Sequence, residues 1–321
     1  MTQKFFVAPL QGHTDAAWRH FHHMEYAAPD VAYITPFIRL EKGVPRERDL
    51  RDFASPLNDS LTLEPQVIFS DADELRSLLT VLSQRGATAV NLNLGCPFPL
   101  QTKRGRGAGI LPDPERLLKA ADILGEFPDL RISVKMRLGY ESPEEWRALM
   151  PALRRIDPAY VAVHPRTAAE QYSGPLHLDS FGEFLHEAEF PLVFNGELHT
   201  PSDIAAITAR FPGIAGVMAG RGIIARPSLF EEYTAGTEFP HDERISRLLR
   251  FHRLLFDHYC DTLCGDSQIL SKIKPFWEYS EAEIGRKPFK ALKKSGSLAS
   301  YRRALNMIER ALTDMHREYI P

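Results

Sequence analysis

The segment N-L-N-L-G-C-P places one cysteine, Cys96, in a glycine and proline turn directly after an apolar run. A free thiol has a pKa of about 8.5, so it is mostly protonated at neutral pH and can donate a proton without special tuning. Most free cysteines are small buried apolar residues, but a turn beyond a strand argues against burial. We therefore predict that Cys96 is a catalytic acid.

Cationic and imidazole side chains occur in pairs in two other apolar segments. Lys135 and Arg137 are two residues apart in R-I-S-V-K-M-R, and His164 and Arg166 are two apart in A-Y-V-A-V-H-P-R. Residues two apart in a strand share one face. Because unpaired cations are costly to bury, the four side chains together predict an anionic or carbonyl-rich ligand.

These residues lie in eight short apolar runs rich in Val, Ile and Phe, each followed by a segment of helical character. The runs span residues 4–10, 31–38, 61–68, 88–96, 131–137, 159–166, 190–197 and 214–221. Such alternation predicts parallel strands with crossover helices, and eight units in 240 residues have the size of a TIM (β/α)8 barrel. The second unit is the least regular, because residues 40–60 are charged and contain Pro45 and Pro56.

After Pro240 the pattern predicts helices alone, at residues 242–263, 267–283, 289–292 and 298–319. The expected α/β architecture is thus a catalytic barrel over residues 1–240 followed by a small C-terminal all-α helical domain over residues 241–321. Residues 241–321 carry 15 Lys and Arg against 11 Asp and Glu, whereas the preceding 240 residues carry 24 against 31. This asymmetry permits a polyanionic partner, although the net charge of −3 argues against nonspecific coating of nucleic acid.

In a TIM barrel the active site lies at the C-terminal ends of the strands. Glycine-containing turns after the seventh and eighth strands predict a phosphate site there. Cys96, Cys260 and Cys264 form no C-x-x-C pair and have no zinc spacing, so we expect neither a disulfide nor a metal site. The strand-end residues are Ala8, Pro9, Leu10, Gln66, Asn93, Cys96, Lys135, Arg137, His164, Arg166, Asn195, Gly196, Glu197, Gly220 and Arg221.

The segment V-N-L-N-L-G-C-P-F-P-L-Q-T-K-R-G-R-G-A-G-I-L resembles the signature loop of the tRNA-dihydrouridine synthases, FMN-dependent enzymes that reduce specific uridines in tRNA. The segments A-P-L-Q-G-H-T-D, V-K-M-R-L-G, H-P-R-T with Q-Y-S-G, N-G-E-L and M-A-G-R-G follow in family order. The resemblance spans the barrel, and the helical tail agrees with it. Three positions depart from the pattern: Leu10 replaces the usual Met, Ser70 a common Gly, and Asn91 a frequent Asp.

The resemblance implies hydride transfer from flavin N5 to uracil C6, protonation of C5 by Cys96, and NADPH or NADH as electron donor. It assigns uridine contacts to Asn93, Arg137, Arg166 and Tyr172. Contacts to the tRNA backbone would come from Lys103, Arg104 and Arg106 beside the cysteine loop, and from Lys287, Lys290, Lys293 and Lys294 in the tail. The FMN contacts would be Ala8, Pro9, Leu10, Gln66, Lys135, His164, Asn195, Gly196, Glu197, Gly220 and Arg221.

Two other functions remain open at this point. One is an FMN barrel that acts on a small molecule such as dihydroorotate or an enone, and the other is a noncatalytic tRNA-binding factor. The start M-T-Q-K-F-F-V-A-P-L resembles no signal peptide, and no apolar run is long enough to cross a bilayer, so we expect a cytoplasmic protein without membrane contact. No protein partner is implied, and a monomer is expected. No motif specifies which uridine is reduced.

Overall fold

The computed structural model of the chain describes residues 3–26 and 28–318, which form two compact units. The first unit consists of Met1–Pro9, Asp30–Gly196 and Ala206–Ala219. The second consists of Leu10–Pro29, Glu197–Ala205 and Gly220–Pro321, so residues 241–321 share a unit with earlier segments. The predicted domain boundary at residue 240 stays a prediction.

The first unit is built on one sheet of nine strand segments that all pair in parallel, which confirms the predicted barrel architecture. Along the sheet the order is β5-β2-β1-β11-β10-β9-β8-β7-β6. Each of the eight predicted runs contributes to it. The segments are β1 (Lys4–Val7), β2 (Val31–Ile34), β5 (Thr62–Glu64), β6 (Gln66–Val67), β7 (Ala89–Leu94), β8 (Arg131–Gly139), β9 (Val161–Thr167), β10 (Leu192–Phe194) and β11 (Gly216–Ala219).

The sheet closes on itself at a proline. Strands β5 and β6 occupy the two ends of the strand order, but only Pro65 separates them in the chain. Proline has no N–H to donate to a neighbouring strand, so the third predicted strand divides there. Its first half pairs with β2 and its second half with β7. The barrel interior contains a buried apolar cluster from five strands, the residue after β1 and the residue before β9: Phe6, Ala8, Ala32, Ile34, Tyr160, Ala162, Val193 and Met218.

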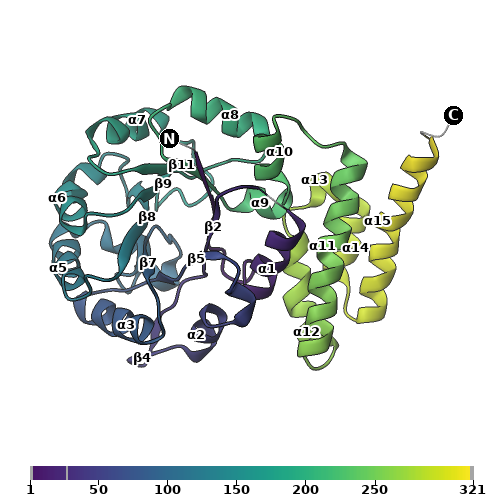
Figure 1. The fold of residues 1–321 in the computed structure, drawn as a ribbon, viewed down its shortest axis with the longest axis horizontal. Helices are drawn as coiled ribbons and strands as arrows, with labels where there is room; N and C mark the ends of the chain where they lie inside the picture. Colours follow the sequence, from purple (N-terminus) through teal and green to yellow (C-terminus); the bar gives the residue numbers. More distant parts are fainter. Residues whose placement is uncertain (1–2, 27, 319–321) are drawn as a thin grey trace. The chain divides into compact units, whose positions relative to one another are not determined.

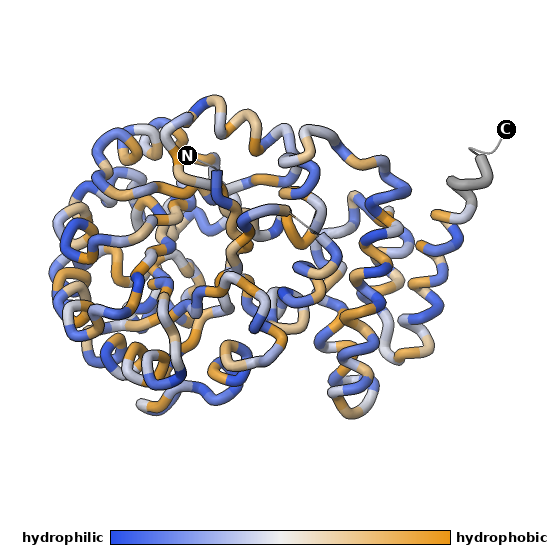
Figure 2. Tube along the Cα trace, viewed as in Figure 1, coloured by the Kyte–Doolittle hydropathy of each residue, from blue (hydrophilic) through white to orange (hydrophobic). Residues whose placement is uncertain are grey.

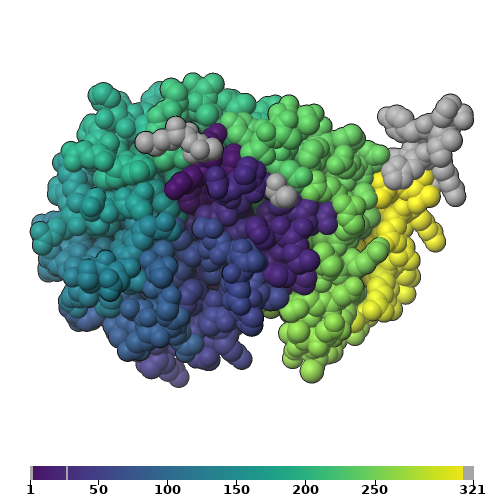
Figure 3. Space-filling view, in the orientation of Figure 1, coloured from purple at the N-terminus to yellow at the C-terminus, as the bar shows by residue number. Residues whose placement is uncertain are grey.

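Helices cover the outside of these strands, as Figure 1 shows for α3 (Ala72–Gln84), α5 (Pro114–Leu124), α6 (Trp146–Ile156) and α7 (Leu178–Glu187). Hydrophobic and hydrophilic residues alternate along them in Figure 2, as expected for helices that bury one face. On the face drawn in Figure 3, side chains fill most of the space between these ribbons. Side-chain oxygens of Asp71 and Asp113 cap α3 and α5.

Residues 40–60 contain short elements in place of a long crossover helix. Strands β3 (Leu40–Glu41) and β4 (Val44–Pro45) form a two-stranded antiparallel sheet. They are followed by α2 (Glu47–Phe53) and by the 3-10 turn η1 (Pro56–Asn58), which begins at the proline. Two more short elements follow β7, namely α4 (Pro99–Thr102) and the 3-10 turn η2 (Gly107–Ile110).

The second unit is helical in its described residues, which confirms the expected C-terminal helices. The predicted helix over residues 267–283 is wrong as one element. The chain there forms a helix, a 3-10 turn at Lys274–Trp277 and a second helix, because Pro275 cannot continue the hydrogen-bond pattern. Helix α8 (Pro201–Arg210) begins in this unit and ends in the first. The helices are α1 (Ala16–Glu25), α9 (Arg221–Ala225), α10 (Leu229–Ala235), α11 (His241–Thr262), α12 (Asp266–Ile273), α13 (Glu281–Ile284), α14 (Arg286–Lys294) and α15 (Leu298–Glu318).

Candidate active site

The fourth, fifth and sixth barrel strands bring four predicted site residues side by side. Asn93 of β7 pairs in register with Lys135 of β8, and Arg137 of β8 pairs with His164 of β9. Lys135 also pairs with Ala162, which belongs to the cluster inside the barrel. Because alternate residues of a strand share one face, Asn93, Lys135 and Arg137 project toward the barrel axis at the ends of their strands.

The cysteine loop after β7 is held by the side chain of Asn93. The Asn93 Oδ1 atom accepts the backbone N–H of Gly95 at 3.1 Å and that of Cys96 at 2.9 Å. The carbonyl oxygen of Cys96 in turn accepts the N–H of Ala108 at 3.1 Å. Cys96 is therefore fixed through both of its backbone polar groups.

Glycine is required where η2 approaches Cys96. Gly107 has a φ of 58°, and a Cβ atom added there would lie 2.9 Å from the Cβ and the carbonyl oxygen of Cys96. Any other residue would be strained in its backbone and would displace the cysteine. The glycine-rich stretch R-G-R-G that follows the cysteine in the sequence thus packs closely against it.

The Cys96 thiol is partly buried, and burial raises its pKa. A hydrogen bond from the backbone of Phe98 and the nearby charges of Lys135 and Arg137 offset part of this effect. Desolvation disfavours the thiolate more than these groups favour it. The sulfur is therefore protonated at neutral pH, which is the form that a proton donor needs.

Lys135 is a partly buried cation at the end of β8. Burial, and next the charge of Arg137, lower the pKa of its ammonium group to about 8. Among the residues that the structure describes, no acidic side chain forms a salt bridge with Lys135. A cation in such surroundings favours a bound group that carries negative charge or acceptor oxygens.

Arg137 is buried and donates hydrogen bonds both to the cysteine loop and to the end of β9. Its Nε donates to the carbonyl oxygen of Gly95 at 3.0 Å, and its Nη1 donates to that of Thr167 at 2.7 Å. The guanidinium carbon lies 5.2 Å from the centre of the Tyr172 ring, within cation–π range. Arg137 thereby connects the cysteine loop to the segment after β9.

His164 and Arg166 are buried together at the end of β9. Arg166 donates from Nη1 to His164 Nε2 at 3.3 Å and from Nε to the Gly174 carbonyl oxygen at 2.6 Å. Since a guanidinium only donates, His164 Nε2 is an acceptor and the imidazole carries its proton on Nδ1. The half-exposed Tyr172 ring lies 6.0 Å from His164.

The Arg106 side chain is too deeply buried to contact RNA. The resemblance assigns Arg106 to the tRNA backbone, but its side chain is 6% exposed. Its guanidinium forms a two-pronged ion pair with Glu74 and also donates to the carbonyl oxygen of Leu40 at 3.2 Å. Arg106 therefore anchors the loop to α3, while Lys103 and Arg104 are exposed as predicted.

The predicted FMN-binding residues fall in both units. In the first, Asn195 donates to the Met218 carbonyl oxygen at 2.7 Å, and a Cβ at Gly196 would approach Leu176 to 3.2 Å. The backbone N–H of Ala8 donates to the carbonyl oxygen of Ala219 at 2.8 Å, and Pro9 follows it.

In the second unit, Arg221 donates to Glu197 at 2.6 Å, and Glu197 also contacts His199 at 2.9 Å. The Arg221 charge is therefore shared with a carboxylate next to the predicted phosphate site. Gly220 precedes α9, and the backbone N–H of Leu10 donates to the Thr14 hydroxyl at 3.0 Å.

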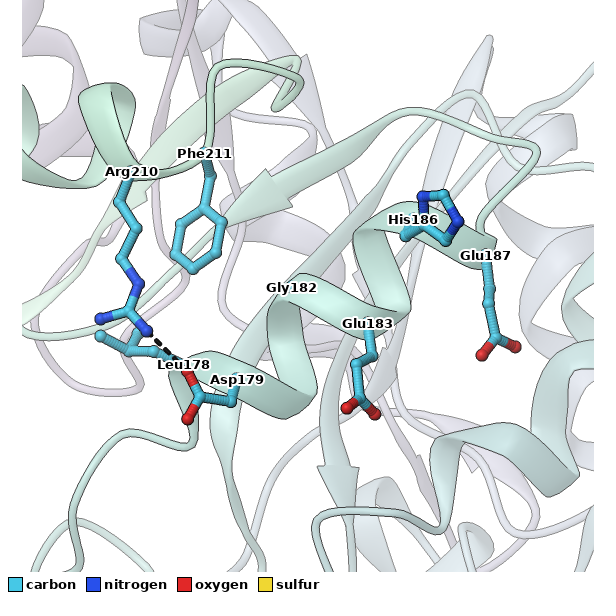
Figure 4. A pocket seen from close by; sticks show the side chains of 8 residues that line it. All are labelled: Leu178, Asp179, Gly182, Glu183, His186, Glu187, Arg210 and Phe211. Carbon is cyan, nitrogen blue, oxygen red and sulfur yellow. Dashed lines mark hydrogen bonds and ion pairs between the residues drawn. The ribbon is translucent and has the colours of Figure 1, made fainter.

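A surface hollow of about 450 Å³ lies on the outside of the first unit, between α7 and the end of α8 (Figure 4). It contains Asp179, which pairs with Arg210, and the carboxylates of Glu183 and Glu187. None of the predicted site residues lines it. Its three carboxylates outnumber its one guanidinium, which does not suit a phosphate-bearing cofactor.

Membrane-spanning helices and metal clusters are both absent from the described residues. No helix among them is long and apolar enough to span a membrane. No group of three or more His, Cys, Asp or Glu side chains in that part of the chain is arranged to hold a metal ion.

Sequence reasoning missed three buried polar residues beneath the site, Glu64, Asn91 and Ser133. The available signal was the alternation of polar residues inside apolar strands, as in Glu64 and Gln66 or Asn91 and Asn93. Such a period of two indicates polar side chains directed into the barrel.

The fold and the site define a parallel β/α barrel that gathers a thiol, a desolvated lysine and two anchored arginines at its strand ends. The same fold occurs in solved structures of morphinone reductase. One has a TM-score of 0.53 and 12% identity, covering 74% of this chain and 86% of that chain. A second, in complex with tetrahydroNAD, has a TM-score of 0.51 and 11% identity, covering 74% and 88%.

The chain belongs to the family described as Dihydrouridine synthase (Dus), which matches residues 6–296. It is 30% identical over 267 residues to a protein named probable tRNA-dihydrouridine synthase from Staphylococcus epidermidis, covering 79% of this chain and 78% of that protein. It is also 29% identical over 265 residues to the probable tRNA-dihydrouridine synthase 2 of Bacillus subtilis, with the same coverage. The resemblance in the cysteine loop is thus confirmed at the level of the family.

Proposed function

We propose that this protein reduces specific uridines in the dihydrouridine loop of tRNA to 5,6-dihydrouridine, with FMN as cofactor and NADPH or NADH as electron donor. Family membership supports the substrate and the reaction type. The observation that carries the mechanism is the position of Cys96 at the strand ends, where Asn93 accepts its backbone N–H and Gly107 packs closely against it.

The residues at the barrel mouth suit a flavin cofactor. The desolvated cation of Lys135 suits the negative charge that a reduced flavin carries near N1. At Gly196 a Cβ would lie 3.2 Å from Leu176, so a glycine lets this turn pack against that side chain. The residues that would hold FMN are Ala8, Pro9, Leu10, Gln66, Lys135, His164, Asn195, Gly196, Glu197, Gly220 and Arg221.

Reduction of uridine adds one hydride and one proton across the C5–C6 double bond. Bound FMN, once reduced, would supply the hydride to C6. Cys96 gives its Sγ proton to C5, and the resulting thiolate regains a proton from water. Because desolvation disfavours that thiolate, the thiol is restored to its acid form between turnovers.

The uracil ring presents two carbonyl oxygens, O2 and O4, which accept hydrogen bonds. Arg137, Arg166 and Asn93 carry N–H donors at the ends of the strands around Cys96. Tyr172 is half-exposed beside Arg137 and offers an aromatic face on which an extruded base can stack. We assign these four residues to the uridine.

Contacts to the RNA backbone would offset the cost of extruding the base. Lys103 and Arg104 are exposed beside the cysteine loop. In the second unit, four lysines are exposed on α14, which buries Leu292 on its other side. They are Lys287, Lys290, Lys293 and Lys294.

The test is to purify the full-length protein, measure its bound flavin and assay it with NADPH on tRNA that lacks dihydrouridine. The proposal expects a yellow protein and dihydrouridine formation that depends on the donor. Turnover of dihydroorotate or an enone without activity on tRNA would favour the small-molecule alternative. A colourless protein that binds tRNA but takes up no FMN would favour the noncatalytic one.

A further inference from the structure

A continuous series of buried hydrogen bonds runs through the barrel from Glu64 to the cysteine loop. Ser133 donates to Glu64 Oε2 at 2.6 Å, and Asn91 Nδ2 donates to Ser133 Oγ at 2.8 Å. Gln66 Nε2 then donates to Asn91 Oδ1 at 2.7 Å, and Asn93 Nδ2 to Gln66 Oε1 at 2.8 Å. Asn93 Oδ1 accepts the N–H of Cys96 at 2.9 Å. All five side chains from Glu64 to Asn93 are buried.

The carboxylate at the far end fixes the direction of this series. Glu64 Oε2 also accepts the Tyr160 hydroxyl at 2.9 Å, and Glu64 Oε1 accepts Arg131 at 3.2 Å. A carboxylate accepts hydrogen bonds and donates none. The Ser133 hydroxyl hydrogen must therefore point at Glu64, so its oxygen is left to accept from Asn91.

The loop end imposes the same direction independently. The backbone N–H groups of Gly95 and Cys96 can only donate, so Asn93 must present Oδ1 to them and Nδ2 to Gln66. Gln66 must then present Oε1 to Asn93 and Nε2 to Asn91. The cysteine loop and Glu64 therefore require the same orientation of the Asn91, Gln66 and Asn93 amides. A reversal at any point would set two donors or two acceptors against each other in a buried site, which is costly.

We propose that Glu64, Ser133 and Asn91 are positioning residues that set the orientation of the Gln66 and Asn93 amides and thereby hold the Cys96 thiol in place for its reaction. None of the three touches the thiol. They act through Asn93, whose Oδ1 is the acceptor for the cysteine loop. The consequence for the reaction rests on the proposed role of Cys96 as proton donor, whereas the consequence for the position of the thiol does not.

Glu64→Gln keeps the shape of the side chain, but it removes the constraint that the carboxylate places on the direction of the hydrogen bonds. A glutamine amide can donate to Ser133, whose hydroxyl then turns to donate to Asn91 Oδ1. A reversed series, in which Asn93 Nδ2 faces the Cys96 N–H, is then opposed at the loop end alone, so it costs less free energy than in the wild-type protein. In molecules that adopt it, the cysteine loop loses its acceptor and the thiol gains access to water.

The experiment measures the rate at which iodoacetamide alkylates Cys96 in the purified full-length protein, resolved by peptide mass spectrometry. The exposed Cys264 in the same sample is the internal control. The variants are Glu64→Gln and, as the matched control, Tyr160→Phe. The control removes the Tyr160 hydroxyl, which contacts both Glu64 and Ser133, but it leaves the carboxylate and the Ser133 hydroxyl in place. Ser133→Ala and Ser133→Thr form a second pair, in which threonine restores the hydroxyl.

We expect Glu64→Gln and Ser133→Ala to speed alkylation of Cys96 by about fivefold or more, as for the loss of one buried hydrogen bond. Tyr160→Phe, Ser133→Thr and the rate at Cys264 should stay near the wild-type values. Equal effects of Glu64→Gln and Tyr160→Phe, or of both Ser133 variants, would overturn the proposal. If Glu64→Gln does not fold, the alkylation rates of Cys96 in Ser133→Ala and Ser133→Thr test the proposal instead.

The same proteins separate this inference from the proposed function. In Glu64→Gln, uridine reduction should slow; flavin content and flavin reduction by NADPH are measured beside it, because the series passes through Gln66, a proposed FMN contact. Loss of dihydrouridine formation in Cys96→Ala together with an unchanged alkylation rate in Glu64→Gln would refute the positioning role alone. Faster alkylation in Glu64→Gln with full activity in Cys96→Ala would refute the proton-donor role alone.

Discussion

Arg137 Nε donates to the carbonyl oxygen of Gly95 at 3.0 Å, so a residue assigned to the uridine also holds the chain directly before Cys96. The same guanidinium reaches Thr167 through Nη1. A lysine keeps the charge but cannot form both bonds with one planar group. We expect Arg137→Lys to lower the rate of dihydrouridine formation about tenfold.

In that variant the FMN content should not change, because Arg137 is not among the proposed flavin contacts. The absorbance of bound flavin and a single-turnover rate with tRNA measure the two effects. Loss of flavin at an unchanged single-turnover rate would place Arg137 in the cofactor site instead.

The pH dependence of uridine reduction should follow the Cys96 thiol. Burial raises the pKa of this thiol, so its acid form persists to higher pH than in a free cysteine, where the pKa is about 8.5. The rate at which tRNA oxidises the reduced flavin should stay level through neutral pH and fall above it, first as Lys135, whose pKa is about 8, loses its charge and then as the thiol ionises. A fall in this rate that begins below neutral pH would contradict a thiol that stays protonated through neutral pH.

The ion pair between Glu74 and Arg106 should stabilise the first unit. Burial acts to raise the pKa of Glu74, but hydrogen bonds from Arg106 and Ser70 outweigh it and hold the pKa below its ordinary value. Because Arg106 is buried, Glu74→Gln would leave its charge uncompensated. We expect a loss of about 2 kcal/mol in the free energy of unfolding, measured with denaturant.

The pH dependence of that loss has a defined sign. A carboxyl whose pKa is lower in the folded than in the unfolded protein adds stability above its unfolded pKa, about 4.3, and this is lost as the pH falls through the folded value. The difference between wild type and Glu74→Gln should therefore shrink in acid. A difference that grows in acid would contradict the ion pair as its cause.

The lysines of α14 should contribute to tRNA binding by neutralising phosphates. Replacing Lys290, Lys293 and Lys294 by alanine should weaken binding. It should also flatten the dependence of log Kd on log salt concentration by about 0.7 to 0.9 for each phosphate that is no longer neutralised. Lys119→Ala removes an exposed charge from α5 in the first unit and serves as control. An unchanged slope in the triple variant would make α14 an ordinary solvated helix.

The barrel and its strand ends could be predicted from the sequence because they depend on local patterns. Apolar runs at regular spacing identify the strands, and the parallel arrangement then places residues such as Lys135 and His164 at one end. Pro275 is equally visible in the sequence, and its missing N–H is a local reason to divide the helix predicted over residues 267–283.

The features that could not be predicted depend on pairing between distant residues. Arg106 resembles an exposed basic residue until Glu74, 32 positions earlier, is found to neutralise it. The hydrogen bond from Asn91 to Ser133 likewise depends on the register between β7 and β8. No single segment of sequence contains that information, and from the sequence Asn93 therefore resembles a base contact alone.

The proton-donor role of Cys96 is tested most directly by Cys96→Ala, assayed with NADPH on tRNA that lacks dihydrouridine, with Cys260→Ala as control. General acid catalysis contributes about 100-fold or more to such a step. We predict a loss of at least that size in Cys96→Ala, with flavin reduction intact and full activity in Cys260→Ala. Undiminished dihydrouridine formation by Cys96→Ala would contradict the proton-donor role.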